Sequence, residues 1–144
     1  MNGRYSSENL YSQIFNRLLD VIPDLQSIDE VGLSEVDGNW PLHFDVVSRS
    51  PTKLIIMLGH SRAEDGGVVI NPEMTIAVYL DRGMAEALTY RDAHMSNSVY
   101  SPDRSHIDIL AKRVLNDYLY TWLGNLIVAG HSIKVACKQE FFSN

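Results

Sequence analysis

Apolar residues recur at helical spacing near the start of the chain. They fall at positions i, i+3, i+4 and i+7 from Leu10 to Ile22, and this period predicts an amphipathic helix over residues 7–21. Pro23 ends the helix, because the proline ring disfavours a helical conformation in the residue before it. The helix therefore presents a single apolar stripe to the rest of the molecule.

A longer apolar stripe lies in the last third of the chain and predicts a helix over residues 105–129, which Gly130 ends. We expect the stripe to face the core and Asn116 to lie on the opposite, solvated face. The residues predicted to line the core are Ile107, Leu110, Ala111, Val114, Leu115, Tyr118, Leu119, Trp122, Leu123, Leu126 and Ile127.

The segments between the two helices have the alternating pattern of β-strands. Residues 54–58 are apolar on both faces, which is typical of a central strand that is covered on both sides. Residues 61–72 are polar and predict a loop with a short edge strand at 68–70. The other predicted strands are 31–36, 42–48, 53–60, 74–80, 84–90 and, more weakly, 132–137.

The strands at 74–80 and 84–90 predict a hairpin with a three-residue loop, in which Gly83 adopts the left-handed conformation. This register pairs Val78 with Glu86 and places Glu86 on an apolar face. A carboxylate in that position needs a partner, access to solvent, or a raised pKa. Glu86 is therefore the candidate ligand-binding residue, as a general acid/base or a ligand anchor. The alternative is a structural glutamate that a Tyr, Arg or Lys satisfies.

Two further groups of polar residues carry potential chemistry. His43 and Asp45 lie two apart on one strand face, but a metal site needs three or four ligands. His60, Glu64 and Asp65 cluster at the end of a strand and in a polar loop, where functional sites often occur. We interpret both groups as ordinary polar surface. The sequence contains no recognisable nucleophile motif or phosphate-binding loop, so we predict no catalytic residue, no metal and no cofactor.

Composition restricts the partners and the compartment. The 144 residues predict a single α+β domain over residues 1–144, with a net charge of −6 and scattered Lys and Arg. This charge argues against nucleic acid and against a membrane surface as partners. The single cysteine, Cys137, and the absence of a signal-peptide pattern predict a protein of the bacterial cytoplasm.

The hairpin and the last helix resemble the YqiB-like proteins, a bacterial family of unknown function. The resemblance covers residues 5–131 and implies a compact cytoplasmic domain, but it supplies no catalytic residue, cofactor or substrate. The residues that carry it are Pro72-Glu73-Met74-Thr75, Tyr79, Asp81, Met84-Ala85-Glu86-Ala87, Tyr100, Pro102, Lys112, Asn116, Leu119, Trp122, Leu123 and Gly130.

These observations predict an α+β fold: a single antiparallel sheet of four to six strands, packed by an N-terminal and a long C-terminal helix. Either each helix covers one face of the sheet, or a second copy covers the remainder, and we expect a homodimer. The first functional hypothesis is a non-catalytic binding or adaptor protein. The second is a small-molecule-binding domain, enzymatic or not, whose pocket lies between the sheet and the C-terminal helix and is anchored by Glu86. The third is a dimer similar to secretion chaperones, on fold-level analogy alone.

Overall fold

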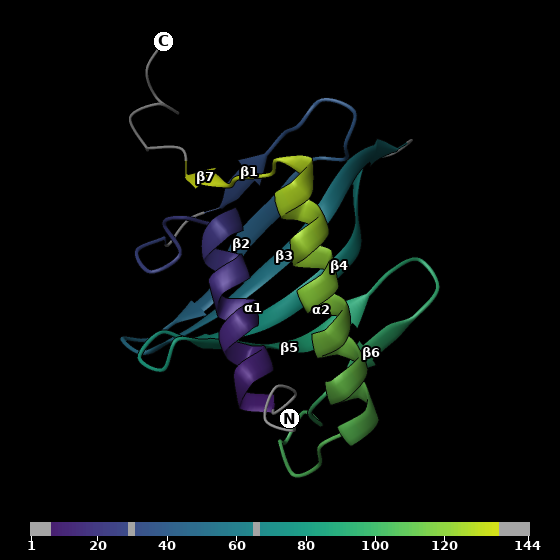
Figure 1. The fold of residues 1–144 in the computed structure, drawn as a ribbon. Helices are drawn as coiled ribbons and strands as arrows, with labels where there is room; N and C mark the ends of the chain where they lie inside the picture. Colours follow the sequence, from purple (N-terminus) through teal and green to yellow (C-terminus); the bar gives the residue numbers. More distant parts are fainter. Residues whose placement is uncertain (1–6, 29–30, 65–66, 136–144) are drawn as a thin grey trace.

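The secondary structure consists of a β-sheet with helices on one of its faces (Figure 1). The computed structural model describes residues 7–28, 31–64 and 67–135. The elements in chain order are α1 (Ser7–Val21), β1 (Gly32–Ser34), β2 (Leu42–Arg49), β3 (Lys53–Glu64), β4 (Gly67–Tyr79), β5 (Met84–Arg91), β6 (Ser96–Ser98), α2 (Ile109–Ala129) and β7 (Lys134–Val135). Neither α1 nor α2, the helices in the described part of the chain, combines the length and the apolar character that crossing a membrane requires.

The strands follow one another across a single antiparallel sheet. Their order is β6-β5-β4-β3-β2-β1-β7, so β1 to β6 form a meander and the two-residue β7 joins the edge beside β1. A meander needs only short connections, which suits the strand spacing in this chain. The α+β class, the antiparallel sheet and the two packing helices are confirmed.

Both helices lie on the same face of the sheet, where they pack beside each other (Figure 1). Arg17 of α1 donates a hydrogen bond of 2.7 Å to the carbonyl oxygen of Tyr120 in α2, and its guanidinium lies 3.7 Å from the centre of that ring. Of the two arrangements that the sequence left open, the one in which each helix covers one face is therefore wrong. The strand residues that form the core beneath the helices are Leu42, Phe44, Leu54, Ile56, Leu58, Met74, Ile76, Val78, Ala85 and Ala87.

The predicted loop at 61–72 is largely an extension of β3 and β4. Ser61 pairs with Ile70 and Glu64 with Gly67, beyond a β-bulge that follows Gly59. The polar composition misled the prediction, because a ladder of backbone hydrogen bonds needs no apolar side chains. The region is a long hairpin whose last residues project past the rest of the sheet (Figure 1).

The hairpin of β4 and β5 has a different register from the predicted one. Tyr79 pairs with Met84 and Ala77 with Glu86, so the connection has four residues, and a bulge near Thr75 shifts the pairing again. Gly83 adopts the predicted left-handed conformation, with φ of 65°. A loop longer by one residue moves the pairs between the loop and the bulge by one position, which is the reason that Glu86 opposes Ala77 instead of Val78.

Candidate functional site

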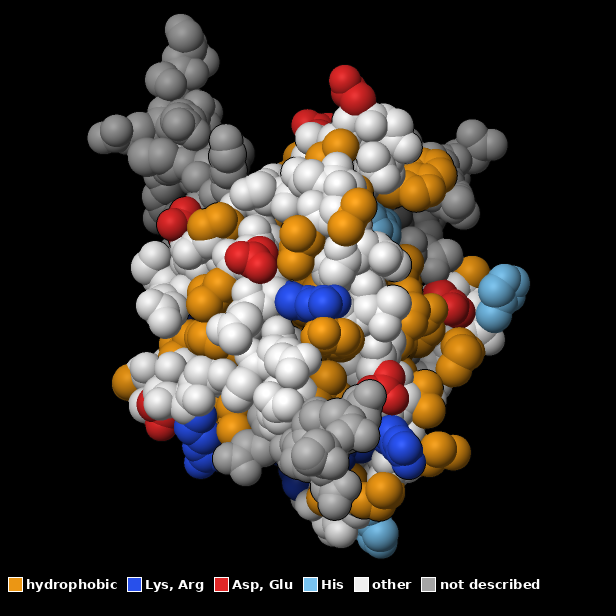
Figure 2. All heavy atoms as spheres, in the orientation of Figure 1, with side chains coloured by type: hydrophobic (Ala, Val, Ile, Leu, Met, Phe, Trp, Pro, Cys, Tyr) orange, Lys and Arg blue, Asp and Glu red, His pale blue; other side chains and the backbone are white. Residues whose placement is uncertain are grey.

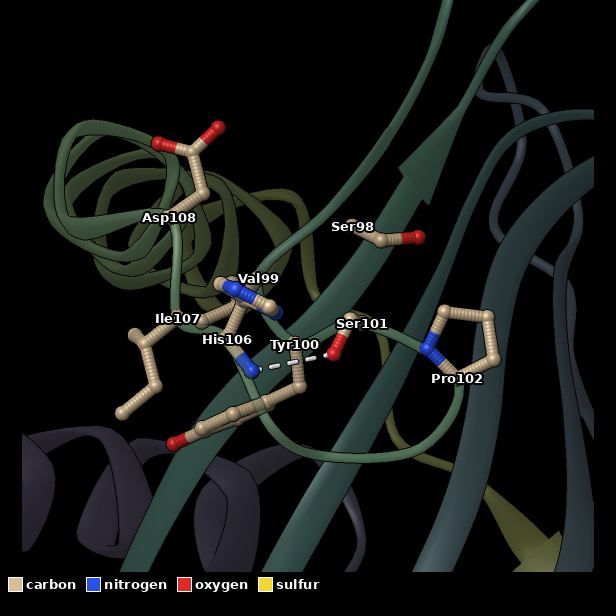
Figure 3. Close-up of a pocket in the computed structure, with 8 residues that line it drawn as sticks. All are labelled: Ser98, Val99, Tyr100, Ser101, Pro102, His106, Ile107 and Asp108. Carbon is tan, nitrogen blue, oxygen red and sulfur yellow. Dashed lines mark hydrogen bonds between the residues drawn. The ribbon is translucent and has the colours of Figure 1, made fainter.

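The segment between β6 and α2 forms an open hollow of about 620 Å³ beside the start of α2 (Figure 3). The side chain of Ser101 accepts a hydrogen bond of 3.1 Å from the backbone N–H of His106, and this bond closes the loop at the base of the hollow. Asp108 is the N-cap of α2 and accepts a bond of 2.9 Å from the N–H of Ala111. The lining residues are Ser98, Val99, Tyr100, Ser101, Pro102, His106, Ile107 and Asp108.

Large apolar side chains of α2 lie exposed next to this hollow. We call Ile107, Leu110, Val114 and Tyr118 the α2 apolar surface; their exposed fractions are 50%, 71%, 51% and 38%. Ile109, at the beginning of the helix, is 70% exposed. Figure 2 shows hydrophobic side chains on the surface in the region of α2, among polar and charged ones. The sequence predicted the four residues of the α2 apolar surface to be core, whereas Ile109 was not part of the predicted stripe.

The geometry of an α-helix explains why these residues are exposed. Leu110 and Leu119 are nine residues apart, which corresponds to about 180° around the helix axis, so one sheet cannot cover both. Leu119 is completely buried. The width of the predicted stripe was therefore the signal that two faces of the helix are apolar, and only one of them contacts the core.

The prediction that Asn116 faces solvent is also wrong, because Asn116 is only 1% exposed. Its side-chain oxygen accepts a hydrogen bond of 2.8 Å from the backbone N–H of Ala87, and its amide donates one of 2.7 Å to the carbonyl of Lys112. Strand β6 pairs with β5 only from Thr89 to Arg91, so Asn116 satisfies a backbone group that β6 does not reach. The bond from Ala87 to Asn116 therefore holds α2 against β5.

Glu86 is buried and fully engaged by other side chains. It lies between Ala85 and Ala87, which belong to the core, so its own side chain points away from that core. Tyr79 donates a hydrogen bond of 2.6 Å to one carboxylate oxygen. Tyr100 and Lys112 donate bonds of 2.7 and 2.8 Å to the other.

The surroundings of Glu86 set the ionisation of the network. Burial raises the pKa of Glu86, but the hydrogen bonds from Lys112, Tyr79 and Tyr100 outweigh burial and lower this pKa overall. Burial and the bond to Glu86 raise the pKa of Tyr79 well above its usual value. The pKa of Lys112 is raised as well, because its bonds to Glu86 and Tyr100 outweigh its burial. Glu86 is thus a carboxylate held by an ammonium and two protonated tyrosines, the alternative that the sequence left open.

This network connects the strand to the start of α2, because Glu86 is on β5 and Lys112 is on α2. Lys112 also donates a hydrogen bond of 2.8 Å to Tyr100, which lines the hollow, and its ammonium lies 5.2 Å from the ring centre of Tyr11 on α1. The network therefore connects strand β5, the first turns of α2 and the loop that lines the hollow. A ligand role for Glu86 stays a prediction.

A second polar cluster lies near the end of α2. The ring centres of His60 and His131 are 5.8 Å apart, and Trp122 donates a hydrogen bond of 3.3 Å to Nε2 of His60. His131 is 4% exposed, and its Nδ1 shares a hydrogen bond of 3.0 Å with the hydroxyl of Ser34. Its Nε2 is buried with no hydrogen-bond partner among the described residues. Burial, and then the neighbouring His60, lower the pKa of His131.

The structure describes the remaining predicted polar groups only in part. His43 and Asp45 alternate on β2 with the core residues Leu42 and Phe44, so they point away from the core. Asp65 and Cys137 lie outside the described residues, and the side chain of Glu64 is not described. In the ranges that the structure describes, no three His, Cys, Asp or Glu side chains gather as metal ligands.

Comparison with known proteins adds a family but no activity. A family model with the description "Protein of unknown function (DUF1249)" matches residues 17–132. No curated protein and no solved structure matches the chain. The matched stretch includes the α2 apolar surface together with Glu86, Tyr79, Tyr100 and Lys112.

Proposed function

The chain belongs to the DUF1249 family of proteins of unknown function, and from that premise we propose that it is a non-catalytic binding or adaptor protein. Its docking site in this proposal is the α2 apolar surface, and its partner is a protein that presents apolar side chains. The observation that carries the proposal is the exposure of 38% to 71% for four large apolar residues. Three of them lie on one side of α2, and Ile107 lies just before its N-cap. Contiguous apolar surface of this kind is characteristic of protein interaction sites.

The surroundings of the surface favour docking. Ile107 belongs both to the α2 apolar surface and to the lining of the hollow, so a partner that covers the helix also has a recess for one of its side chains. At the other end, the ring of Tyr118 stacks on Trp122, with 6.1 Å between centres, and contacts Tyr90 edge-on at 5.3 Å. Aromatic residues held in this way are typical anchors of protein interfaces.

The surface is also held in a fixed position before any partner arrives. The bonds of Glu86 to Lys112 and of Ala87 to Asn116 tie the first half of α2 to β5. A preorganised surface loses less conformational entropy on binding, so more of the contact energy contributes to affinity. In this proposal the buried carboxylate supports the docking site and does not itself meet the partner.

Site-specific photo-cross-linking in living cells tests the proposal. A photoreactive amino acid replaces Leu110 in one variant and Val114 in a second. The control variant carries it at Asn16, an exposed position on α1. We expect discrete cross-linked products from positions 110 and 114 and none from position 16. Equal labelling at all three positions, or no product at any, would contradict a docking role for the α2 apolar surface.

The other hypotheses remain predictions. A small-molecule ligand anchored by Glu86 has to displace Tyr79, Tyr100 or Lys112 from the carboxylate. The hollow that the structure shows lies beside the start of α2 and not between the sheet and the helix. The closer likeness to the YqiB-like proteins and the analogy with secretion chaperones rest on the sequence alone.

A further inference from the structure

We propose that the partner on the α2 apolar surface is a second copy of this chain, with the two α2 helices packed antiparallel about a two-fold axis. This inference rests on the proposed function, because it uses the same surface. In an isologous interface the same patch occurs on both subunits, so the patch must complement itself in shape, in hydrophobicity and in charge. The side of α2 that carries Leu110, Val114 and Tyr118 meets this requirement.

The charges beside the surface are self-complementary. Arg113 and Asp117 are exposed, they lie one helical turn apart, and neither forms an ion pair with any residue that the structure describes. At about 100° per residue, both lie along one border of the stripe formed by Leu110 and Val114. The apolar stripe is thus bordered by one positive and one negative side chain that have no partner of opposite charge within the described chain.

An antiparallel pairing brings these charges together twice. If the two-fold axis passes the level of residue 115, Arg113 of one copy is level with Asp117 of the second copy, and the reverse pair forms by symmetry. Measured along the helix axis, Val114 then lies about 3 Å from Val114 of the second copy. Leu110 lies close to the level of Tyr118 of the second copy. In a parallel pairing, the two-fold axis runs along the helices and places the charged borders of the two copies on opposite edges of the interface, so Arg113 and Asp117 gain no partner of opposite charge from each other. The charge pattern therefore selects the antiparallel arrangement.

The net charge of the chain favours the α2 apolar surface over the rest of the molecule as the place where two copies meet. Each copy carries a net charge of −6, and two acidic molecules repel each other unless their contact is locally balanced. The border of the α2 apolar surface offers one cation and one anion per copy. A single pair of helices buries less than the roughly 1,600 Å² of a standard interface, so we expect a reversible dimer of micromolar affinity.

Sedimentation equilibrium of the purified full chain, over a range of about 1 to 200 µM, tests the dimer. We expect wild-type protein to move from the monomer mass to the dimer mass across this range. Leu110→Asp should weaken the dimer at least tenfold, while its helical circular dichroism stays unchanged and its melting temperature equals that of wild type at a dilution where both proteins are monomers. A monomer mass at every concentration would overturn the proposal, and so would a dimer whose affinity Leu110→Asp leaves unaltered.

Charge reversal tests the antiparallel register specifically. Arg113→Asp places two acidic residues opposite two others, and Asp117→Arg does the same with basic residues, so each variant alone should dimerise at least tenfold more weakly than wild type. Mixed together, the two variants should form a heterodimer, because each acidic border then meets a basic one. The double variant Arg113→Asp/Asp117→Arg should recover the wild-type affinity. Failure of both rescues would overturn this register.

The cross-linking experiment separates failure of the dimer from failure of the docking site. Products at positions 110 and 114 with twice the mass of the chain agree with the dimer. Products of another mass, together with a monomer in sedimentation, would overturn the second copy as partner but retain the docking site. The absence of products from both positions, with a monomer in sedimentation, would overturn both.

Discussion

The two sides of α2 differ in what covers them and hardly at all in residue type. Leu119, on the inner side, is completely buried in the core, whereas Leu110, on the outer side, is 71% exposed. Tyr118 lies between them at 38%. The same helix therefore supplies part of the core with one side and an uncovered apolar surface with the other. An apolar residue on a helix needs a partner, but that partner need not belong to the same chain.

This comparison shows what a hydrophobic stripe can and cannot indicate. Its period establishes the helix, and its width indicates how many surfaces the helix has to meet. A stripe that contacts one sheet occupies little more than a third of the helix circumference. The stripe of α2 runs from Leu110 to the opposite side at Leu119, which is too wide for one sheet.

The largest expected effect concerns the inner side. Trp122→Ala should lower the free energy of unfolding by about 3–5 kcal/mol, because the indole is 6% exposed and its removal leaves a cavity. Urea denaturation of the purified protein measures this loss. A loss below about 1 kcal/mol would mean that the inner side of α2 is not the packed one.

Asn116→Ala should be the second most costly change on this side. The substitution leaves the backbone N–H of Ala87 without its acceptor in a buried position, at a cost of about 1–3 kcal/mol. Asn125→Ala, an exposed asparagine on the same helix, is the matched control and should cost less than about 0.5 kcal/mol. Equal losses in the two variants would show that the bond to β5 contributes nothing.

The contribution of the Glu86–Lys112 ion pair to the stability of the fold should depend on pH. Glu86→Gln should cost about 1–3 kcal/mol at pH 7, because Lys112 loses the carboxylate that it pairs with. The folded pKa of Glu86 is lowered, so its contribution to stability is present above the unfolded pKa of about 4.3 and is lost as the pH falls below that value. Wild type and variant should therefore converge in acid.

The exposed ion pair of Glu73 and Arg91 provides the control for the Glu86–Lys112 ion pair. Arg91 is 65% exposed, so Glu73→Gln should cost less than about 1 kcal/mol at pH 7, which is a smaller loss than that of Glu86→Gln at the same pH. Denaturation curves between pH 3 and pH 7 compare the two substitutions. If the Glu86 variant lost no more than the Glu73 variant at pH 7, the first turns of α2 would need another anchor.

The sequence determined the elements better than their contacts. Helix α1 begins and ends where the pattern predicts, and the strands from Leu42 and from Lys53 begin where the alternation does. The register of β4 and β5 was missed because a bulge near Thr75 allows the apolar faces to segregate in more than one pairing. Local patterns indicate which residues share a face, and the loop length decides which residues face each other.

The candidate site was predictable in part. Glu86 stood out because the predicted register placed a carboxylate on the apolar face of the hairpin, opposite Val78. The structure shows that it is buried, but opposite Ala77 and on the other face. Its partners could not be named, because Tyr100 and Lys112 are separated from it by 14 and 26 residues and reach it only after α2 has packed. The sequence showed that the residues of the α2 apolar surface are apolar, but we assigned them to the core. Periodicity alone does not indicate which of two apolar sides of a helix is covered.

The cluster near the end of α2 contains a group, His131, whose contribution to stability should change near neutral pH. Burial and His60 lower the folded pKa of His131, so the unfolded chain binds a proton more readily, and stability should fall as the pH decreases through about 6.5. Urea denaturation between pH 7.5 and pH 5.5 should show this fall in wild type and a smaller one in His131→Gln. The exposed His94 is the control, and His94→Gln should leave the wild-type slope unchanged.

The smallest expected effect is the most direct test of the comparison between the two sides. Leu110→Ala and Leu119→Ala remove the same atoms from the same helix, but only Leu119 is buried. Leu119→Ala should cost about 2–5 kcal/mol, and Leu110→Ala should cost less than about 0.5 kcal/mol when the protein is dilute enough to be a monomer. The melting temperature of wild type should rise with protein concentration, because dimerisation stabilises the folded chain by mass action. In Leu110→Ala this rise should be reduced. If Leu110→Ala instead destabilised the dilute protein as much as Leu119→Ala, both sides of α2 would be covered within one chain, and the outer side would have no partner to bind.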